Sequence, residues 1–116
     1  MTLNAAIAKA NELRPNTLND EMKADWVAQL DGDVAEMMEL PTPSPDFPVD
    51  HELLMPAPYD YIYVYYLCAL IDQANEESTL YANDMAIANS AIAEARAWWR
   101  RHNRPNEDEN YVRGLW

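Results

Sequence analysis

The chain has 116 residues, of which 49% are hydrophobic, and it carries a formal net charge of −12 at pH 7. This length suits one domain with one modest core, and the presence of only two glycines argues against a fold rich in β-turns. Strong acidity excludes general binding to nucleic-acid phosphates. Every apolar run is shorter than the roughly 20 residues of a membrane span, and the first residues lack a secretion-signal pattern. A single cysteine, Cys68, excludes an internal disulfide framework and fits a reducing compartment.

The first predicted helix follows Thr2, whose hydroxyl can cap it, and ends before Pro15. Its apolar residues recur at steps of three and four, which places them on one narrow stripe. This stripe consists of Leu3, Ile7, Ala10 and Leu13.

The second predicted helix starts at Thr17 or Asn19 and runs to about Leu40. Gly32 lies within it and costs about 1 kcal/mol relative to Ala, so we expect a bend or a close contact there. The predicted core face consists of Met22, Trp26, Leu30, Val34 and Met37, with Val27 and Met38 at its edges.

A proline-rich loop is predicted over residues 41–58, which hold six of the eight prolines. Such a stretch is extended rather than helical. A disordered linker would normally contain fewer large apolar residues, so we expect an ordered excursion that packs on the bundle or on a neighbouring molecule. A passive crossover between two helix pairs remains the alternative. The apolar residues concerned are Phe47, Val49, Leu53, Leu54 and Met55.

Two long antiparallel helices are predicted over residues 58–104, joined by the short link 75–78. Pro58 suits the first turn of one helix, and Ser78 or Thr79 can cap the other, which stops at Pro105. The core stripe of the earlier helix is Tyr59, Ile62, Tyr63, Tyr66, Leu67, Leu70, Ile71 and Ala74. That of the later helix is Leu80, Asp84, Ile87, Ala91, Ala95 and Trp98, flanked by Met85, Ala88, Ile92 and Trp99.

Surplus tyrosine is the most unusual feature of the earlier helix in this pair. Tyr61, Tyr65 and Cys68 form a second stripe, away from the core stripe. A helix that is apolar on two faces is either central in its domain or covered by another chain, and tyrosine is enriched at protein interfaces. Both readings remain open from the sequence alone.

The positive charge is concentrated in one short band. Residues 1–95 hold 17 acidic side chains against three basic ones, whereas residues 96–104 hold four arginines and no acid. Cations at a helix C-terminus suit its dipole, and we hypothesise that this band also meets an acidic surface on a neighbouring copy. The adjacent Trp98 and Trp99 are interpreted as the end of the core stripe rather than as a base-stacking platform.

The C-terminal residues 106–116 form a tail beyond a helical domain of residues 1–105. An acidic run, 107–109, precedes four apolar residues: Tyr111, Val112, Leu115 and Trp116. A free end of this kind exposes apolar surface, so we expect it to dock on its own domain or on a partner.

No motif for chemistry is found. Two isolated glycines make neither a phosphate loop nor a nucleophile elbow, and Asp31-Gly32-Asp33 lacks the further ligands of a calcium loop. His51 and His102 have no partner at metal-ligand spacing. Cys68 is expected to be an inert packed thiol. We therefore predict no enzyme activity, no cofactor and no metal.

Three stretches resemble the small all-α head–tail connector, or adaptor, proteins of tailed phages and prophages. They are TLNAAIAKANELRPNTLNDEMKADWVAQLDGDV, ELLMPAPYDYIYVYYLCALIDQANEE and LYANDMAIANSAIAEARAWWRRHNRP. The most specific pieces are Leu-Asp-Gly, Leu-Leu-Met-Pro-Ala-Pro-Tyr-Asp and Trp-Trp-Arg-Arg-His. The resemblance covers nearly residues 1–105 and ends at the tail, because that family commonly ends in a short basic segment containing Gly.

The resemblance implies an all-α bundle of about four helices and a homo-oligomeric ring, commonly of twelve subunits, fixed below the portal protein. Such a ring is a structural protein of the virion at the head–tail junction, present in the host cytoplasm during assembly. It contacts the portal and the next head-completion or tail protein, and DNA passes its channel without specific binding. No membrane, cofactor or reaction is involved.

Eight residues are the candidate subunit or partner contacts: Tyr61, Tyr65, Arg96, Arg100, Arg101, Arg104, Phe47 and Trp116. The alternative function is a small acidic helical interaction protein, a DNA mimic or binder of a host factor, which the charge alone supports.

Overall fold

The computed structural model describes residues 1–41 and 51–103. Within these residues the chain forms four α-helices and one short 3-10 helix, so the predicted small all-α bundle is confirmed. Among the helices of residues 1–41 and 51–103, none combines the length and the hydrophobicity that a membrane-spanning segment needs. The elements are α1 (Leu3–Leu13), α2 (Asp20–Met37), η1 (Tyr59–Tyr61), α3 (Ile62–Ala74) and α4 (Ser78–His102).

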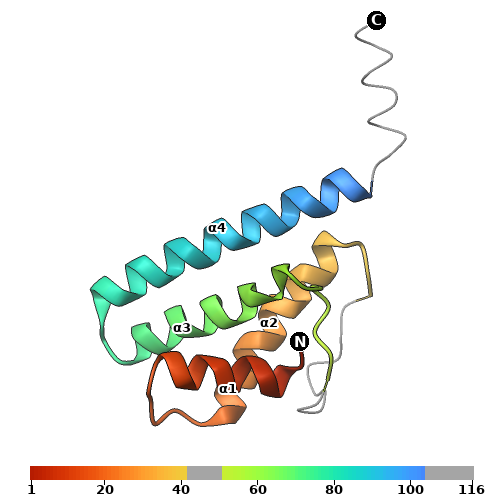
Figure 1. Cartoon of the computed structure of the whole chain (residues 1–116). Coiled ribbons are helices and arrows are strands. Elements are labelled where there is room, and N and C mark those ends of the chain that lie inside the picture. Colours follow the sequence, from red (N-terminus) through yellow and green to blue (C-terminus); the bar gives the residue numbers. More distant parts are fainter. Residues whose placement is uncertain (42–50, 104–116) are drawn as a thin grey trace, which may run out of the picture.

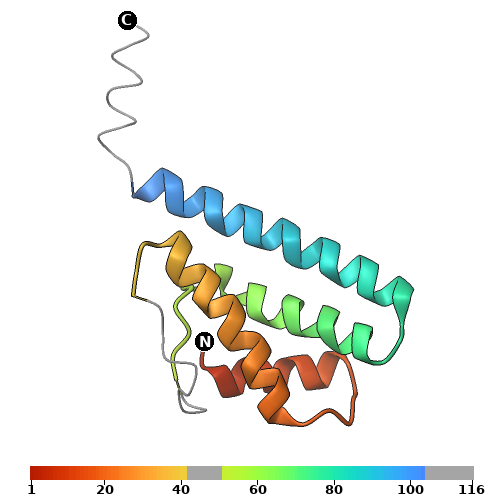
Figure 2. The same ribbon diagram turned by 180° about the vertical axis from the view of Figure 1, so that it is seen from behind.

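Helix α3 lies at the centre of the bundle. It packs against α1, α2 and α4, and most extensively against α4. Figures 1 and 2 show α4 lying along α3 on one side, with α1 and α2 on the other. The predicted antiparallel hairpin of helices is therefore correct, but its first α-helix begins at Ile62, after the 3-10 helix η1, and not at Pro58. Packing against three other helices explains why α3 is apolar around most of its circumference.

The start of α1 agrees with the capping prediction, since the Thr2 hydroxyl accepts a hydrogen bond from the Ala5 amide. Leu3, Ile7 and Ala10 are buried as expected. Leu13, however, is 54% exposed, because the stripe turns away from the core in the last turn. Asn19 caps α2 by accepting from the Met22 amide, which selects one of the two predicted starts.

The predicted core face of α2 is confirmed at Leu30 and Val34, which are buried, but the buried side is turned by part of a turn relative to the prediction. Met22, Trp26 and Met37 are only half-buried, whereas the residues placed at the edges, Val27 and Met38, are buried. Two polar residues of α2, Lys23 and Asp31, are also buried on this side of the helix. A prediction from apolar spacing alone leaves such residues out. Buried residues of the helix itself are Lys23, Val27, Leu30, Asp31, Val34 and Ala35.

Helix α2 ends earlier than predicted, at Met37 rather than near Leu40. Glu39 adopts φ 58°, in the left-handed region, and the Leu40 amide donates to the Ala35 carbonyl, as helix ends often do. A side chain added at Gly32 would meet nothing within 4 Å. The expected close contact at this glycine is therefore absent.

The described end of the proline-rich loop packs on the bundle, as predicted. Leu53 and Met55 are buried, and an antiparallel bridge joins Glu52 to Thr2. The Leu3 amide donates to the His51 carbonyl, and the Leu53 amide donates to the Met1 carbonyl. These two backbone hydrogen bonds hold the segment beside the start of α1. Residues 42–50, with Phe47 and Val49, lie outside the described residues.

Helix α4 begins at Ser78, but no side chain caps it, so the predicted capping by Ser78 or Thr79 is wrong. Two members of its predicted core stripe, Leu80 and Ile87, are 38% and 50% exposed. The other four members of that stripe face the bundle as predicted, together with three of the residues predicted to flank it. The four are Asp84, Ala91, Ala95 and Trp98, and the three are Ala88, Ile92 and Trp99. The interpretation of the two tryptophans as the end of the core is confirmed.

Candidate functional site

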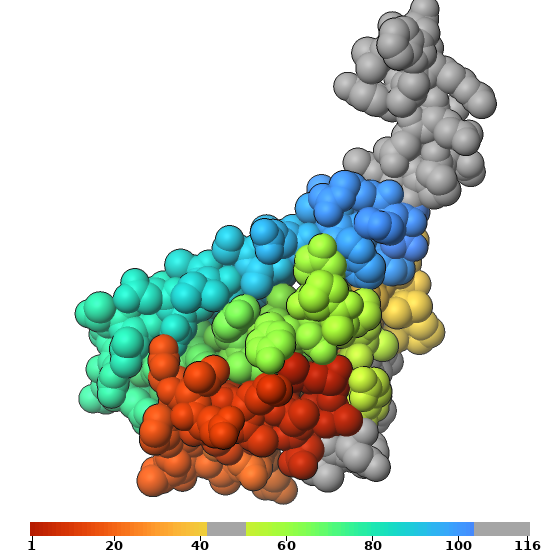
Figure 3. Space-filling model, in the orientation of Figure 1, coloured from red at the N-terminus to blue at the C-terminus, as the bar shows by residue number. Residues whose placement is uncertain are grey.

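Helix α3 is left uncovered along two lines, and these are the candidate contact surfaces. The first runs between α1 and α4, where Figure 3 shows side chains of α3 at the surface. Tyr61 is 43% exposed and Tyr65 is half-buried, with ring centroids 6.1 Å apart. We call Tyr61 and Tyr65 the tyrosine strip.

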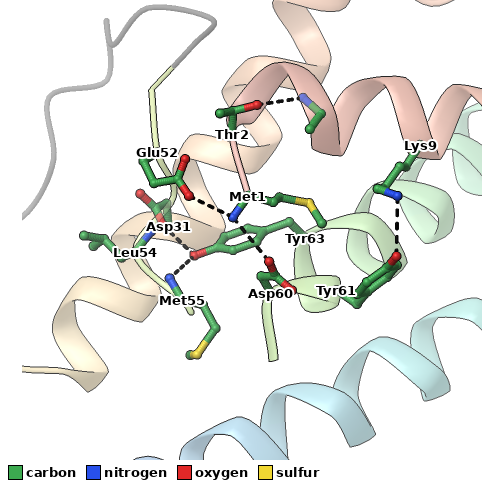
Figure 4. Close-up of polar contacts among 11 residues, drawn as sticks. Met1, Thr2, Lys9, Asp31, Glu52, Leu54, Met55, Asp60, Tyr61 and Tyr63 are labelled. Atoms are coloured by element: carbon green, nitrogen blue, oxygen red, sulfur yellow. Dashed lines mark hydrogen bonds and ion pairs between the residues drawn. The ribbon is translucent and has the colours of Figure 1, made fainter. Parts of the chain in front are cut away.

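The tyrosine strip is joined to α1 through Lys9. The ammonium of Lys9 donates to the Tyr61 hydroxyl over 3.4 Å and lies 5.5 Å from the centre of its ring. The two side chains meet in Figure 4. Cys68, placed on the same stripe by the sequence, is instead buried, so the tyrosine strip keeps two of the three predicted residues, Tyr61 and Tyr65.

The second uncovered line is an open groove of about 520 Å³ between α2 and α4. A smaller pocket of about 20 Å³ adjoins it and shares Leu30, Met37 and Ile92 with it. The groove is apolar at its base and carries acidic groups from α2 and a cation from α4. Its lining residues are Leu30, Asp33, Glu36, Met37, Tyr66, Asn89, Ile92 and Arg96. We call this feature the α2–α4 groove.

Tyr66 was predicted to lie in the core stripe but lines the groove and is only half-buried. Burial raises the pKa of its hydroxyl, and the nearby Asp33 carboxylate adds to the rise. Tyr59 is also half-buried and stacks on Trp98, with ring centroids 5.1 Å apart. Ala74, at the last position of the same predicted stripe, is exposed.

The basic band lies on the surface at the end of α4. Arg96, Arg100 and Arg101 are all exposed. The helix end is capped locally, because the side-chain Nδ2 of Asn103 donates to the Trp99 carbonyl over 2.9 Å. The remaining arginine of the band, Arg104, lies outside the described residues, as does Trp116.

A buried polar network joins α2, α3 and the end of the proline-rich loop (Figure 4). The Tyr63 hydroxyl donates to Asp31 Oδ1 over 2.6 Å and accepts from the Met55 amide over 2.9 Å. The Leu54 amide donates to the same carboxylate oxygen over 3.0 Å. Burial raises the pKa of Tyr63 far above its ordinary value, so this hydroxyl stays a donor.

This network was not predicted from the sequence. Asp31 was considered only as part of a metal motif, and its side chain is fully buried. His51 Nε2 lies 3.8 Å from its second oxygen. The described residues contain no group of three or more side chains able to hold a metal ion.

A second buried polar cluster joins the turn after α1 to the α3–α4 hairpin. Arg14 Nε lies 3.2 Å from Asp72 Oδ1, and the guanidinium also binds both oxygens of Asp84, at 3.0 and 3.1 Å. Burial raises the pKa of Asp72 to about 7, and the neighbouring Asp84 adds to the rise against the charge of Arg14. Asp84 thus lies on the inner face of α4 as a partner of Arg14.

The raised pKa of Asp72 predicts a dependence of stability on pH. Between about pH 4 and pH 7 the folded chain holds a proton that the unfolded chain has released, so the free energy of unfolding falls as pH rises through this window. Asp72→Asn should reduce the fall between pH 5 and 8 by about 1–3 kcal/mol. Urea unfolding at several pH values measures the free energy of unfolding of the variant and of the unaltered chain. Asp25→Asn, at an exposed position, is the control, and parallel curves for Asp72→Asn and the unaltered chain would contradict the assignment.

Cys68 is confirmed as a packed thiol. It is 4% exposed, and burial raises its pKa to about 11. Because the thiolate is the reactive form, this environment makes the side chain a poor nucleophile.

Comparison with protein-family models, with curated protein sequences and with solved structures finds no match to this chain.

Proposed function

We propose that this chain is the subunit of a head–tail connector ring, which sits below a phage portal and joins the DNA-filled head to the tail. The observation that carries the proposal is the resemblance of residues 1–105 to that family. The protein would act as a structural adaptor without a reaction or a cofactor.

The most specific pieces of the resemblance meet in the folded chain, which supports reading them as one unit. Asp31, from the Leu-Asp-Gly piece, accepts a hydrogen bond from Leu54 of the proline-containing piece. Tyr59, from the same proline-containing piece, stacks on Trp98 of the Trp-Trp-Arg-Arg-His piece. Residues that are far apart in the sequence thus form a continuous set of contacts between α2, the end of the proline-rich loop and α4.

The distribution of charge suits contacts between identical subunits in a ring. Subunits related by rotation meet through two different, complementary patches. The start of α2 carries the exposed acids Asp20, Glu21 and Asp25, while the end of α4 carries exposed arginines. Figures 1 and 2 show these two helix ends on opposite sides of the bundle, so they are available to neighbours rather than to each other.

The tyrosine strip supplies a second candidate contact in the proposed ring. Tyrosine combines apolar area with a hydroxyl that can hydrogen-bond at a partly wet interface. The acidic remainder of the subunit suits a channel wall that DNA slides past, because phosphates are repelled by it.

The portal protein of the genome that encodes this chain is the partner with which to test the proposal. Multi-angle light scattering of the mixture should show a complex of defined mass, with several copies of this chain per portal ring. A mixture that elutes as the two separate components, at low and physiological salt, would overturn the proposed function.

Reversing two charges at the end of α4 tests the subunit contact. Arg100→Glu with Arg101→Glu should abolish the complex while the circular dichroism of the helices is unchanged, because both side chains are exposed. Adding Glu21→Arg and Asp25→Arg should restore assembly. Asn83→Glu with Ala86→Glu, at exposed positions near the other end of α4, is the control for added negative charge. Loss of helical signal in the arginine variant would contradict an interface role.

The alternative, a small acidic protein that binds a basic host factor, is favoured by the acidic start of α2. Such binding would be lost as salt screens the charges. Capture of a basic host protein together with failure to bind the portal would replace the connector by this function.

A further inference from the structure

The α2–α4 groove is an uncovered surface within the described chain. Its base is formed by Leu30, Met37, Tyr66 and Ile92, and its polar groups come from both flanking helices. An apolar groove with a mixed charged rim suits a short peptide segment that alternates apolar and charged residues.

We propose that the α2–α4 groove is occupied by the C-terminal segment of the same chain, residues 106–116. This inference goes beyond the proposed function and does not depend on it. The segment contains four large apolar residues, Tyr111, Val112, Leu115 and Trp116, within its last six positions.

The position of the groove on α4 puts it within reach of the segment. Arg96 and Asn89 lie six and thirteen residues before the end of α4, His102, or about 9 Å and 20 Å along the helix axis. The chain continues for thirteen residues beyond Asn103, and an extended stretch of that length spans up to about 43 Å. The segment is therefore long enough to reverse direction and run back along α4.

The order of charges in the segment matches the order of charges along this path. The acidic run 107–109 comes first in the segment, and it follows in sequence the last turn of α4, which carries Arg100 and Arg101. Arg113 follows among the apolar residues, where the groove presents Asp33 and Glu36. Opposite charges therefore meet at both points when the segment runs antiparallel to α4.

The same chain is favoured over a second copy because the segment is tethered beside the groove. A short covalent tether gives an effective concentration on the order of millimolar, and closing a loop of this length costs little extra entropy. A second copy must supply the same contacts and also lose its freedom of motion on association.

Paramagnetic relaxation in the full-length protein tests the proposal. A nitroxide label on Asn110→Cys should reduce the amide peak intensities of Asp33, Asn89 and Ile92. The native Cys68 is buried, and mass spectrometry checks that one label is attached. A label on Asn4→Cys, at an exposed position of α1, is the control for non-specific contact.

Three outcomes decide the question. Intensity loss in the labelled, isotope-enriched chain, absent when unlabelled enriched chains are mixed with labelled unenriched ones, supports docking within the chain. Loss confined to the last turn of α4 overturns the proposal. Loss of equal strength in the mixed sample also overturns it, because the groove is then filled by a second copy.

A charge swap separates specific docking from proximity. Arg113→Glu should weaken the intensity loss at the groove, since it places a third negative charge beside Asp33 and Glu36. Adding Asp33→Lys should restore the loss. Unchanged intensities in both variants would show that the proposed pairing of charges is wrong.

Discussion

Replacing Tyr63 with Phe is expected to lower the free energy of unfolding by about 2–3 kcal/mol. The hydroxyl is the link between the buried Asp31 carboxylate and the Met55 amide. Its removal leaves the buried Asp31 side chain with one donor fewer and the Met55 amide without its acceptor, while the ring still fills the same space. Urea unfolding followed by circular dichroism measures the change, and the midpoint of thermal unfolding should fall by roughly 10 °C.

The matched control for Tyr63→Phe is Tyr65→Phe, two residues along the same helix. Tyr65 is half-buried and belongs to the tyrosine strip, so removal of its hydroxyl should change the free energy of unfolding by less than about 0.5 kcal/mol. An equal decrease in the free energy of unfolding for the two variants would show that the hydrogen bonds of the Tyr63 hydroxyl stabilise the fold no more than the Tyr65 hydroxyl does.

Arg14→Met is expected to cost about 2–4 kcal/mol at pH 8. Methionine retains much of the apolar stem of Arg14 but removes the guanidinium cation that contacts both Asp72 and Asp84. Two carboxylates then remain close together in a poorly solvated place. The loss should be smaller at pH 5, because the pKa of Asp72 is already raised to about 7 and the proton replaces part of the lost charge.

Unfolding by urea at pH 5 and pH 8 measures this difference. Arg101→Met removes an exposed arginine from the same chain and should have little effect at either pH. A cost for Arg14→Met that is identical at the two pH values would mean that the carboxylates of the cluster do not take up a proton.

The number and order of the helices could be predicted because each has local signals. Thr2 and Asn19 cap their helices as expected, and the apolar spacing of residues 62–71 reveals α3. These signals depend only on residues a few positions apart, so one sequence is enough to read them.

The buried polar residues could not be predicted, because their partners lie far away in the chain. Asp31 and Tyr63 are 32 positions apart, and Arg14 and Asp84 are 70 apart. In the sequence an aspartate on α2 or α4 looks like a solvated residue. Only the packing of three elements around it turns it into an internal acceptor.

The candidate contacts divide along the same line. The exposure of Tyr61 was predicted because its helix carries more tyrosines than one core face can bury. The exposure of the three described arginines was predicted from their charge. The α2–α4 groove was missed, because Tyr66 and Ile92 follow an apolar spacing that indicates a core. The groove is lined by residues of α2, α3 and α4, so it depends on how three helices pack together. The spacing of apolar residues within one helix cannot predict such an arrangement.

The central place of α3 has a consequence for how the chain folds. Its most extensive packing is with α4, from which it is separated by only three residues, 75–77. Contacts between neighbours in sequence require little loop-closure entropy and form quickly, whereas those of α1 and α2 with α3 close longer stretches of chain. We therefore expect the α3–α4 hairpin to form before α1 and α2 pack on it, so substitutions between α3 and α4 should slow refolding more than those between α1 and α3.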